Sequence, residues 1–202
     1  ITPEAGSYYN ITLDKDKGYT DDGQGNYTVT SAEGLKNIAK LVNEEGKTDI
    51  DITLTGNITL TGEWTPIGTE SQPYTGTFDG DGHRITGLKI DQSGTDCVGL
   101  IGRLGSGGKV QGVALTNISV SGANYVGGIA GQNDGTVENC SVNGTVTGRG
   151  FTDTGGIVGT NYGTISGCSA EGTVTGSVNV GGIAGGSYLG ATIVGCYSSA
   201  AV

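Results

Sequence analysis

The sequence predicts an all-β fold, a right-handed parallel β-helix (β-solenoid) with a short capping helix near its N-terminal end. Glycine accounts for 41 of the 202 residues and recurs at fixed places between short runs of Val, Ile and Thr. That pattern is typical of many short strands separated by tight turns. A glycine-flanked signature recurs along the chain, and no helical periodicity follows residue 45.

The recurring signature has the form Gly-[Leu/Ile]-[Ile/Ala/Val]-Gly. The first glycines of its four copies lie at positions 99, 128, 156 and 182, a nearly constant spacing. Each repeat holds about three strands that are too short to form a sheet alone. Winding the chain into coils pairs each strand in parallel with its equivalent one turn later, about 4.8 Å away. The signatures occupy residues 99–102, 128–131, 156–159 and 182–185.

Other repeat architectures fit less well. Leucine-rich and ankyrin repeats need helices, and a propeller blade needs four strands and about 40 residues. In a coil, glycine serves where a corner needs a positive φ or where two backbones approach closely. We expect roughly six coils between residues 48 and 202, and a right-handed sense from the general rule for parallel crossovers.

We expect one domain over residues 1–202: a lead-in at 1–29, a capping helix at 30–45 and coils at 46–202, with regular repeats from about residue 97. Thr30 and Glu33 form a capping-box pattern. Leu35, Ile38, Leu41 and Val42 then recur at helical spacing, and residues 43–46 end the helix. Such a helix would cover the apolar cross-section and open strand edge of the first coil. The last coil shows no such cap, so we expect flanking repeats or domains in a larger protein.

Charge and hydropathy exclude some classes of partner. The formal net charge is −10 and the basic residues are few and scattered, which argues against nucleic acid as a partner. The acidity fits a protein that stays soluble outside the cell. The sequence contains no apolar run of the length that a membrane-spanning helix requires, so no membrane span is expected in this chain.

The signature segments resemble the GLUG-repeat family of bacterial surface proteins. The resemblance extends to the segments 27–43, 63–68 and 78–83 and covers about residues 27–202. It implies a β-helical, secreted or surface-displayed module, as in candidate adhesins and in the non-catalytic repeats of IgA-cleaving metallopeptidases. The family offers no catalytic residues to carry over, and no cofactor is expected.

Catalysis finds little support in the candidate residues. His83 is the single histidine and lies in Asp-Gly-Asp-Gly-His-Arg, which favours a tight turn between strands. A polysaccharide lyase is the enzymatic alternative, because such chemistry needs calcium-binding carboxylates and a basic residue on one face. Arg84, Arg103 and Arg149 occupy different repeat positions, and few outward carboxylates accompany Glu138 and Glu171. We therefore assign no catalytic residue.

Two other features resemble binding sites. The acidic loop 14–22 resembles a calcium loop but lacks the EF-hand order, so a solvated loop is favoured and calcium stays open. Cys140, Cys168 and Cys196 recur at a constant step, once in each repeat. They are expected to form an inward column of free thiols rather than disulfides or a zinc site. Their redox state is left open, and no metal site is assigned.

Outward Thr-x-Thr triplets raise ice binding as a further class. A flat ice-matching face needs many triplets in register, and only two here share a repeat position: 145/147 and 173/175, but not 53/55 and 59/61. We therefore expect an extracellular, non-catalytic module that serves adhesion, ligand binding or spacing. Its partner would be a host or matrix glycan or protein, and the sequence does not reveal the residues that bind it.

Overall fold

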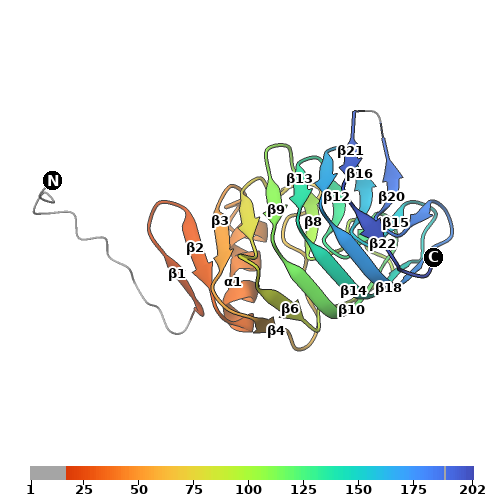
Figure 1. Ribbon diagram of the computed structural model, residues 1–202. Coiled ribbons are helices and arrows are strands. Elements are labelled where there is room, and N and C mark those ends of the chain that lie inside the picture. Colours follow the sequence, from red (N-terminus) through yellow and green to blue (C-terminus); the bar gives the residue numbers. More distant parts are fainter. Residues whose placement is uncertain (1–16, 189) are drawn as a thin grey trace, which may run out of the picture.

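The computed structural model describes residues 17–188 and 190–202 and confirms a parallel β-solenoid of about six turns (Figure 1). Strands one turn apart pair in parallel. Val137 lies opposite Ile165, which lies opposite Ile193, so each residue pairs with its equivalent in the next repeat. The all-β solenoid prediction is confirmed, and the right-handed sense stays a prediction.

Sheet A extends along the whole solenoid. Its neighbouring strands are parallel, except for the first pair, which is antiparallel. Within its strands buried residues alternate with more exposed ones, as expected of a sheet with one face toward the core. In spatial order the strands are β1 (Tyr19–Asp21), β2 (Asn26–Val29), β3 (Asp51–Leu54), β5 (Thr77–Asp79), β9 (Lys109–Gln111), β13 (Thr136–Glu138), β17 (Thr164–Ser166) and β21 (Thr192–Val194).

Sheet B contains the longest strands and lies along the lower side of the solenoid in Figure 1. The Thr triplets 145/147 and 173/175 stack here as predicted. Its strands are β4 (Ile58–Thr59), β6 (Arg84–Thr86), β7 (Lys89–Gln92), β10 (Ala114–Gly122), β14 (Ser141–Gly148), β18 (Ser169–Thr175) and β22 (Tyr197–Ser198).

Sheets C and D are shorter and contain, or directly flank, the glycine signatures. Sheet C consists of β8 (Ile101–Leu104), β12 (Ala130–Asn133), β16 (Val158–Asn161) and β20 (Ala184–Ser187). Sheet D consists of β11 (Val126–Gly127), β15 (Thr154–Gly155) and β19 (Val180–Gly181). Each turn from β11 onward thus passes through sheet D, sheet C, sheet A and sheet B in that order.

The predicted helix is confirmed as α1 (Ala32–Asn43), with its apolar side chains in the core. Its cap differs from the prediction: Ser31, not Thr30, is the N-cap, and its Oγ accepts a hydrogen bond from the Gly34 amide at 3.1 Å. The Ser31 hydroxyl also donates to the Gly18 carbonyl, which ties the helix start to the β1 turn. The helix ends near Gly46, whose φ is +72°.

The expected lead-in at 1–29 requires a correction. Strand β2 within it pairs in parallel with β3, so sheet A begins before the helix rather than at residue 46. The helix therefore lies between two strands of the first turn, and β1 covers the open edge of sheet A as an antiparallel partner. The sequence showed the helix pattern clearly but contained no repeat signal for strands this short.

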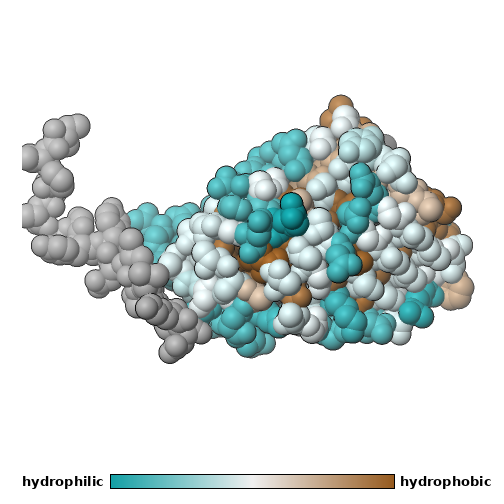
Figure 2. Space-filling model, turned by 60° about the horizontal axis from the view of Figure 1, so that its bottom comes forward, coloured by the Kyte–Doolittle hydropathy of each residue, from teal (hydrophilic) through white to brown (hydrophobic). Residues whose placement is uncertain are grey.

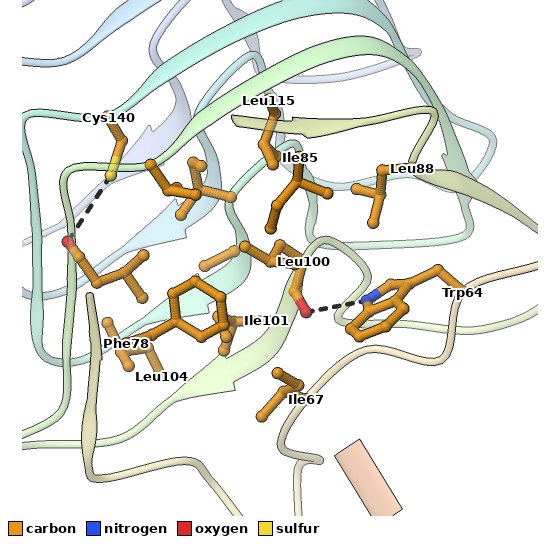
Figure 3. Packing of buried hydrophobic residues seen from close by; sticks show 14 of the residues in the cluster. Trp64, Ile67, Phe78, Ile85, Leu88, Leu100, Ile101, Leu104, Leu115 and Cys140 are labelled. Atoms are coloured by element: carbon orange, nitrogen blue, oxygen red, sulfur yellow. Dashed lines mark hydrogen bonds between the residues drawn. The ribbon is translucent and has the colours of Figure 1, made fainter. Parts of the chain in front are cut away.

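The core is a continuous column of aliphatic side chains with a few large aromatic residues near its N-terminal half. Trp64 is 1% exposed, and its indole nitrogen donates to the Leu100 carbonyl at 3.1 Å (Figure 3). Tyr74 is fully buried and its hydroxyl donates to the Ile50 carbonyl at 2.8 Å. These bonds satisfy the polar ends of aromatic residues that otherwise fill apolar space.

Apolar side chains are exposed at the C-terminal end of the solenoid, where Figure 2 shows hydrophobic atoms gathering at the right. Within the described residues no further layer stacks on the last strands β19 to β22. The most exposed large side chains there are Val194, Tyr197 and Val202.

The last glycine of each signature is required by close backbone approach. None of these glycines has a positive φ. A Cβ on Gly131, Gly159 or Gly185 would lie 2.3–2.5 Å from backbone atoms of the preceding turn. These atoms belong to the first residue of a sheet D strand or to the segment just before the sheet. The positive φ expected of corner glycines occurs elsewhere, at the stacked positions after sheet A: Gly112, Asn139, Gly167 and Gly195.

Gly159→Ala should therefore lower the free energy of unfolding by about 1–3 kcal/mol, because the new methyl group would lie 2.5 Å from the Val126 amide nitrogen and 2.6 Å from the Gly131 carbonyl oxygen. Denaturant unfolding followed by circular dichroism measures this. Gly94→Ala is the matched control, since nothing lies within 4 Å of its Cβ position. Equal stability of the two variants would contradict the close-approach explanation.

Candidate functional site

The signature glycines bring the backbone that enters sheet D against sheet C, and this contact creates a polar and aromatic surface. We call it the tyrosine face. It is formed by side chains from positions just before sheet D, within sheet C and just after sheet C, namely Tyr125, Asp153, Thr160, Tyr162, Asn179 and Tyr188.

Two rows of equivalent positions border this face. In the first row the Val126 amide donates to the Asp153 carbonyl at 3.1 Å and the Thr154 amide to the Asn179 carbonyl at 3.0 Å, so Tyr125, Asp153 and Asn179 occupy equivalent positions in successive turns. In the second row, the Tyr162 amide donates to the Asn133 carbonyl at 2.8 Å and the Tyr188 amide donates to the Asn161 carbonyl at 3.0 Å. Each acceptor directly precedes the equivalent position one turn earlier. The second row therefore contains Asp134, Tyr162 and Tyr188.

Tyr162 and Tyr188 form an exposed aromatic pair. Their ring centroids lie 5.2 Å apart with an interplanar angle of 23°, and the residues are 47% and 43% exposed. The spacing follows from the solenoid rise, because side chains in equivalent positions of parallel strands stack about 4.8 Å apart. The two rings cover each other's inner faces, so the pair forms a small aromatic platform of ring edges and outer faces that is about half exposed.

Asp153 is a buried carboxylate, 2% exposed, at the base of the tyrosine face. It accepts hydrogen bonds from the Thr160 hydroxyl at 2.7 Å, the Asn179 amide at 2.8 Å and the Tyr188 hydroxyl at 3.0 Å. A buried carboxylate needs such partners to offset its loss of water. The network fixes the orientation of Tyr188 and thereby of the aromatic pair.

The surroundings of Tyr125 and Tyr188 disfavour ionisation of their phenols and raise the pKa of both. The hydrogen bond to Asp153 and, after it, partial burial and the carboxylate charge raise the pKa of Tyr188 above its ordinary value. Burial raises the pKa of Tyr125, and the nearby Tyr162 adds to that rise. At neutral pH Tyr125 and Tyr188 therefore present neutral hydroxyl groups, which both donate and accept hydrogen bonds.

A second buried polar cluster has a structural explanation. Asn133 and Asn161 are fully buried, and the Asn133 amide donates to the Asn161 side-chain oxygen at 2.7 Å. Each asparagine oxygen also accepts from the backbone amide two residues later, and Asn161 donates to the Ser187 hydroxyl. This ladder holds the turn between sheets C and A and offers no free group to a ligand.

The sequence-based site predictions have mixed outcomes. His83 lies in the predicted tight turn between β5 and β6, where its amide donates to the Gly80 carbonyl at 2.7 Å. Of the arginines, Arg84 lies in sheet B and Arg103 in sheet C, and Arg149 follows β14, so the three do not converge. Glu138 pairs with Lys109 at 2.8 Å, and Glu171 accepts from the Asn143 amide.

The acidic loop 14–22 is only partly within the described residues, since residues 14–16 lie outside them. Asp21 and Asp22 accept hydrogen bonds from the Gly23 and Gln24 amides, both at 2.7 Å, which organises the β1–β2 turn. Over residues 17–188 and 190–202, no group of three or more His, Cys, Asp or Glu side chains is placed to hold a metal ion.

The inward cysteine column is confirmed. The Cys140 amide lies 3.5 Å from the Cys168 sulfur, and the Cys168 amide lies 3.4 Å from the Cys196 sulfur. All are free thiols, as expected, and Cys140 also lies 3.8 Å from the Val110 carbonyl (Figure 3). The hydrogen bond with Cys168, together with burial, raises the pKa of Cys140 well above its ordinary value.

Sequence reasoning did not find the tyrosine face. Tyr125, Tyr162 and Tyr188 vary in sequence context, and Asp153 has no equivalent carboxylate in the neighbouring repeats. The sequence did contain a pattern for the second row. Asp134, Tyr162 and Tyr188 all lie at the same distance after the last glycine of a signature, directly after a strand of sheet C. That the first row lies beside the second depends on the folding of sheet D onto sheet C, which no local pattern encodes.

These features define the class of the protein: a parallel β-solenoid repeat module with a polar and aromatic surface. More particularly, the GLUG motif model matches residues 122–147 and 152–175, which confirms the resemblance seen in the sequence at these two repeats. No helix of the described residues is both long and apolar enough to cross a membrane.

Two curated proteins share sequence with the chain. Halomucin of Haloquadratum walsbyi is 49% identical over 79 residues, which is 39% of this chain and 1% of halomucin. A candidate Gly-rich membrane protein of Evansella cellulosilytica is 34% identical over 122 residues, which is 57% of this chain and 14% of that protein. The chain thus spans a small part of the length of both relatives.

A solved structure shares the fold. The crystal structure of a candidate immunoglobulin A1 protease from Bacteroides ovatus matches with a TM-score of 0.59 and 22% identity, over 86% of this chain and 67% of that chain. At this level of identity the match supports the solenoid fold alone.

Asp153→Asn should lower the pKa of the Tyr188 phenol toward its ordinary value, because the neutral amide no longer disfavours the phenolate. NMR titration of the tyrosine ring signals between pH 8 and pH 12 would measure this, with Tyr188→Phe assigning the signal. An unchanged Tyr188 pKa in Asp153→Asn would show that the carboxylate does not control this hydroxyl.

Proposed function

We propose that this chain is an extracellular, non-catalytic module of a larger surface protein and that it binds carbohydrate through the tyrosine face. The observation that carries the proposal is the exposed Tyr162–Tyr188 stack, whose Tyr188 hydroxyl is fixed by the buried Asp153. The exposed ring edges and outer faces of the pair can contact the apolar faces of sugar rings, while fixed polar groups bind the sugar hydroxyls.

Other properties of the chain support the surface setting. The GLUG repeats and the sequence shared with halomucin and with a Gly-rich membrane protein fit a repeat module of surface proteins. The net charge of −10 fits an extracellular environment in which solubility matters. A rigid solenoid also spaces a ligand-binding surface away from whatever anchors the larger protein.

The form of the tyrosine face favours an elongated ligand. Its rows run along the solenoid axis, with equivalent side chains repeating about every 4.8 Å. The face thus presents polar and aromatic groups along a line, which suits a chain of sugar units better than a compact ligand. Among its charged groups, Asp153 is buried, so the exposed part of the face is largely neutral.

Tyr162→Ala and Tyr188→Ala should each weaken oligosaccharide binding about tenfold, because each removes half of the aromatic platform. A glycan array would identify the ligand and isothermal titration calorimetry would measure the affinity. Tyr197→Ala is the matched control, since Tyr197 is also exposed but lies on β22, away from the tyrosine face.

Circular dichroism of each variant would verify that the solenoid is intact. Three results would contradict the proposal: no saccharide bound by the array, equal affinity in all three variants, or release of products from a bound polysaccharide. The last result would replace the binding module with an enzyme of the lyase class.

A further inference from the structure

A surface cavity of about 710 Å³ lies beside the N-terminal end of the second row of the tyrosine face. It is formed by the turn after α1, the loop before β5 and the turn after β8, together with Asp134. Asp134 belongs to the same row as Tyr162 and Tyr188, so the cavity and the aromatic pair border one another along the solenoid axis. Nothing in the function proposed above uses this cavity.

Arg103 supplies the positive charge of the cavity. Its Nε donates to an Asp134 carboxylate oxygen at 3.0 Å, and the Gln132 amide donates to the same carboxylate. Within residues 17–188 and 190–202, no side chain or carbonyl accepts a hydrogen bond from the two terminal amino groups of Arg103. These amino groups form a planar edge that matches the two oxygens of a carboxylate.

The rest of the lining is neutral and rich in hydrogen-bonding groups. The side chains of Thr48, Gln72 and Ser106 line the cavity and form no hydrogen bond with any other part of the chain that the structure describes. Hydroxyl and amide groups of this kind bind the hydroxyls of a sugar, since they both donate and accept. The lining therefore combines one guanidinium edge with several free neutral groups.

The cavity wall is held in place by the core. The Tyr74 hydroxyl donates to the Ile50 carbonyl at 2.8 Å, and the Tyr74 amide donates to the Arg103 carbonyl at 3.0 Å. The neighbouring Gln72 amide donates to the Thr69 hydroxyl at 3.1 Å. A wall anchored this way loses little conformational entropy when a ligand binds.

We propose that this cavity binds a carboxylated sugar unit, a hexuronate, with the Arg103 guanidinium on the carboxylate and the neutral side chains on the ring hydroxyls. The inference rests on the proposed function and deepens it: the glycan recognised by the tyrosine face is acidic at its Arg103 end. Because the chain carries a net charge of −10, long-range electrostatics oppose such a ligand, and Arg103 determines whether it binds.

NMR chemical-shift titration of the full chain with sodium D-glucuronate and with D-glucose, at matched ionic strength, tests the proposal. Glucuronate should bind at least tenfold more tightly than glucose and shift signals of Arg103, Gln72 and Ser106. Arg103→Gln should remove that preference, and Arg103→Lys should retain part of it because the charge stays but the planar edge is lost. Equal binding of the two sugars, or no binding of either, would overturn the proposal.

Asp134→Asn provides a second readout that a purely structural role of Arg103 would not change. Removing the carboxylate removes its repulsion of the ligand, so glucuronate should bind several-fold more tightly while glucose binding stays the same. Unchanged or weaker glucuronate binding in Asp134→Asn would count against the site. Tighter binding of glucose 6-sulfate than of glucuronate would overturn the hexuronate assignment and indicate that Arg103 binds a sulfated sugar.

The two proposals fail separately. Tyr162→Ala should weaken binding of an oligosaccharide and leave glucuronate binding unchanged, because the monosaccharide occupies only the cavity. If the tyrosine variants bind oligosaccharides normally while Arg103→Gln abolishes glucuronate binding, the proposed function is wrong and the cavity remains. If instead the tyrosine variants lose oligosaccharide binding while Arg103→Gln leaves glucuronate binding unchanged, the cavity proposal is wrong and the proposed function stands.

Discussion

Close contact between backbones in successive turns is the constraint on which the rest of this structure depends. Parallel pairing fixes the distance between equivalent strands, and the last glycine of the second, third and fourth signatures lets the chain that enters sheet D lie against sheet C. A side chain at that glycine would separate the two layers. The aliphatic columns then fill the space that the backbone defines, so the glycines determine the cross-section and the apolar residues stabilise it.

The same stacking brings the equivalent surface positions of successive turns side by side. Each position outside the core column recurs once in every turn. Where two neighbouring repeats both have a tyrosine at such a position, the two rings stack. The core positions hold mostly aliphatic residues, with Cys140, Cys168 and a few large aromatics, whereas the positions before sheet D and after sheet C hold Tyr, Asp and Asn. The groups of the proposed binding surface therefore lie at these variable positions.

The buried and partly buried polar groups differ in whether they bond only within the fold or also reach the surface. The Asn133–Asn161 ladder uses all of its oxygen acceptors within the turn and stabilises the fold. Asp153, one corner away, is just as buried but accepts from Tyr188, whose ring is exposed. It links the interior to the surface and orients the aromatic platform. Arg103 differs again, because only one edge of its guanidinium is paired.

The amino-acid sequence by itself determined the solenoid, the length of its turns, a helix within 30–45 and the column of Cys140, Cys168 and Cys196, because each is encoded by periodicity along the chain. It missed the Ser31 cap and the strands β1 and β2, since such short segments carry too weak a pattern. Only the tertiary structure decided that the signature glycines serve backbone contact rather than positive φ. It also placed Asp153 beside Tyr188 and Arg103 beside the cavity, because these neighbours come from different turns and their proximity depends on how sheet D folds onto sheet C.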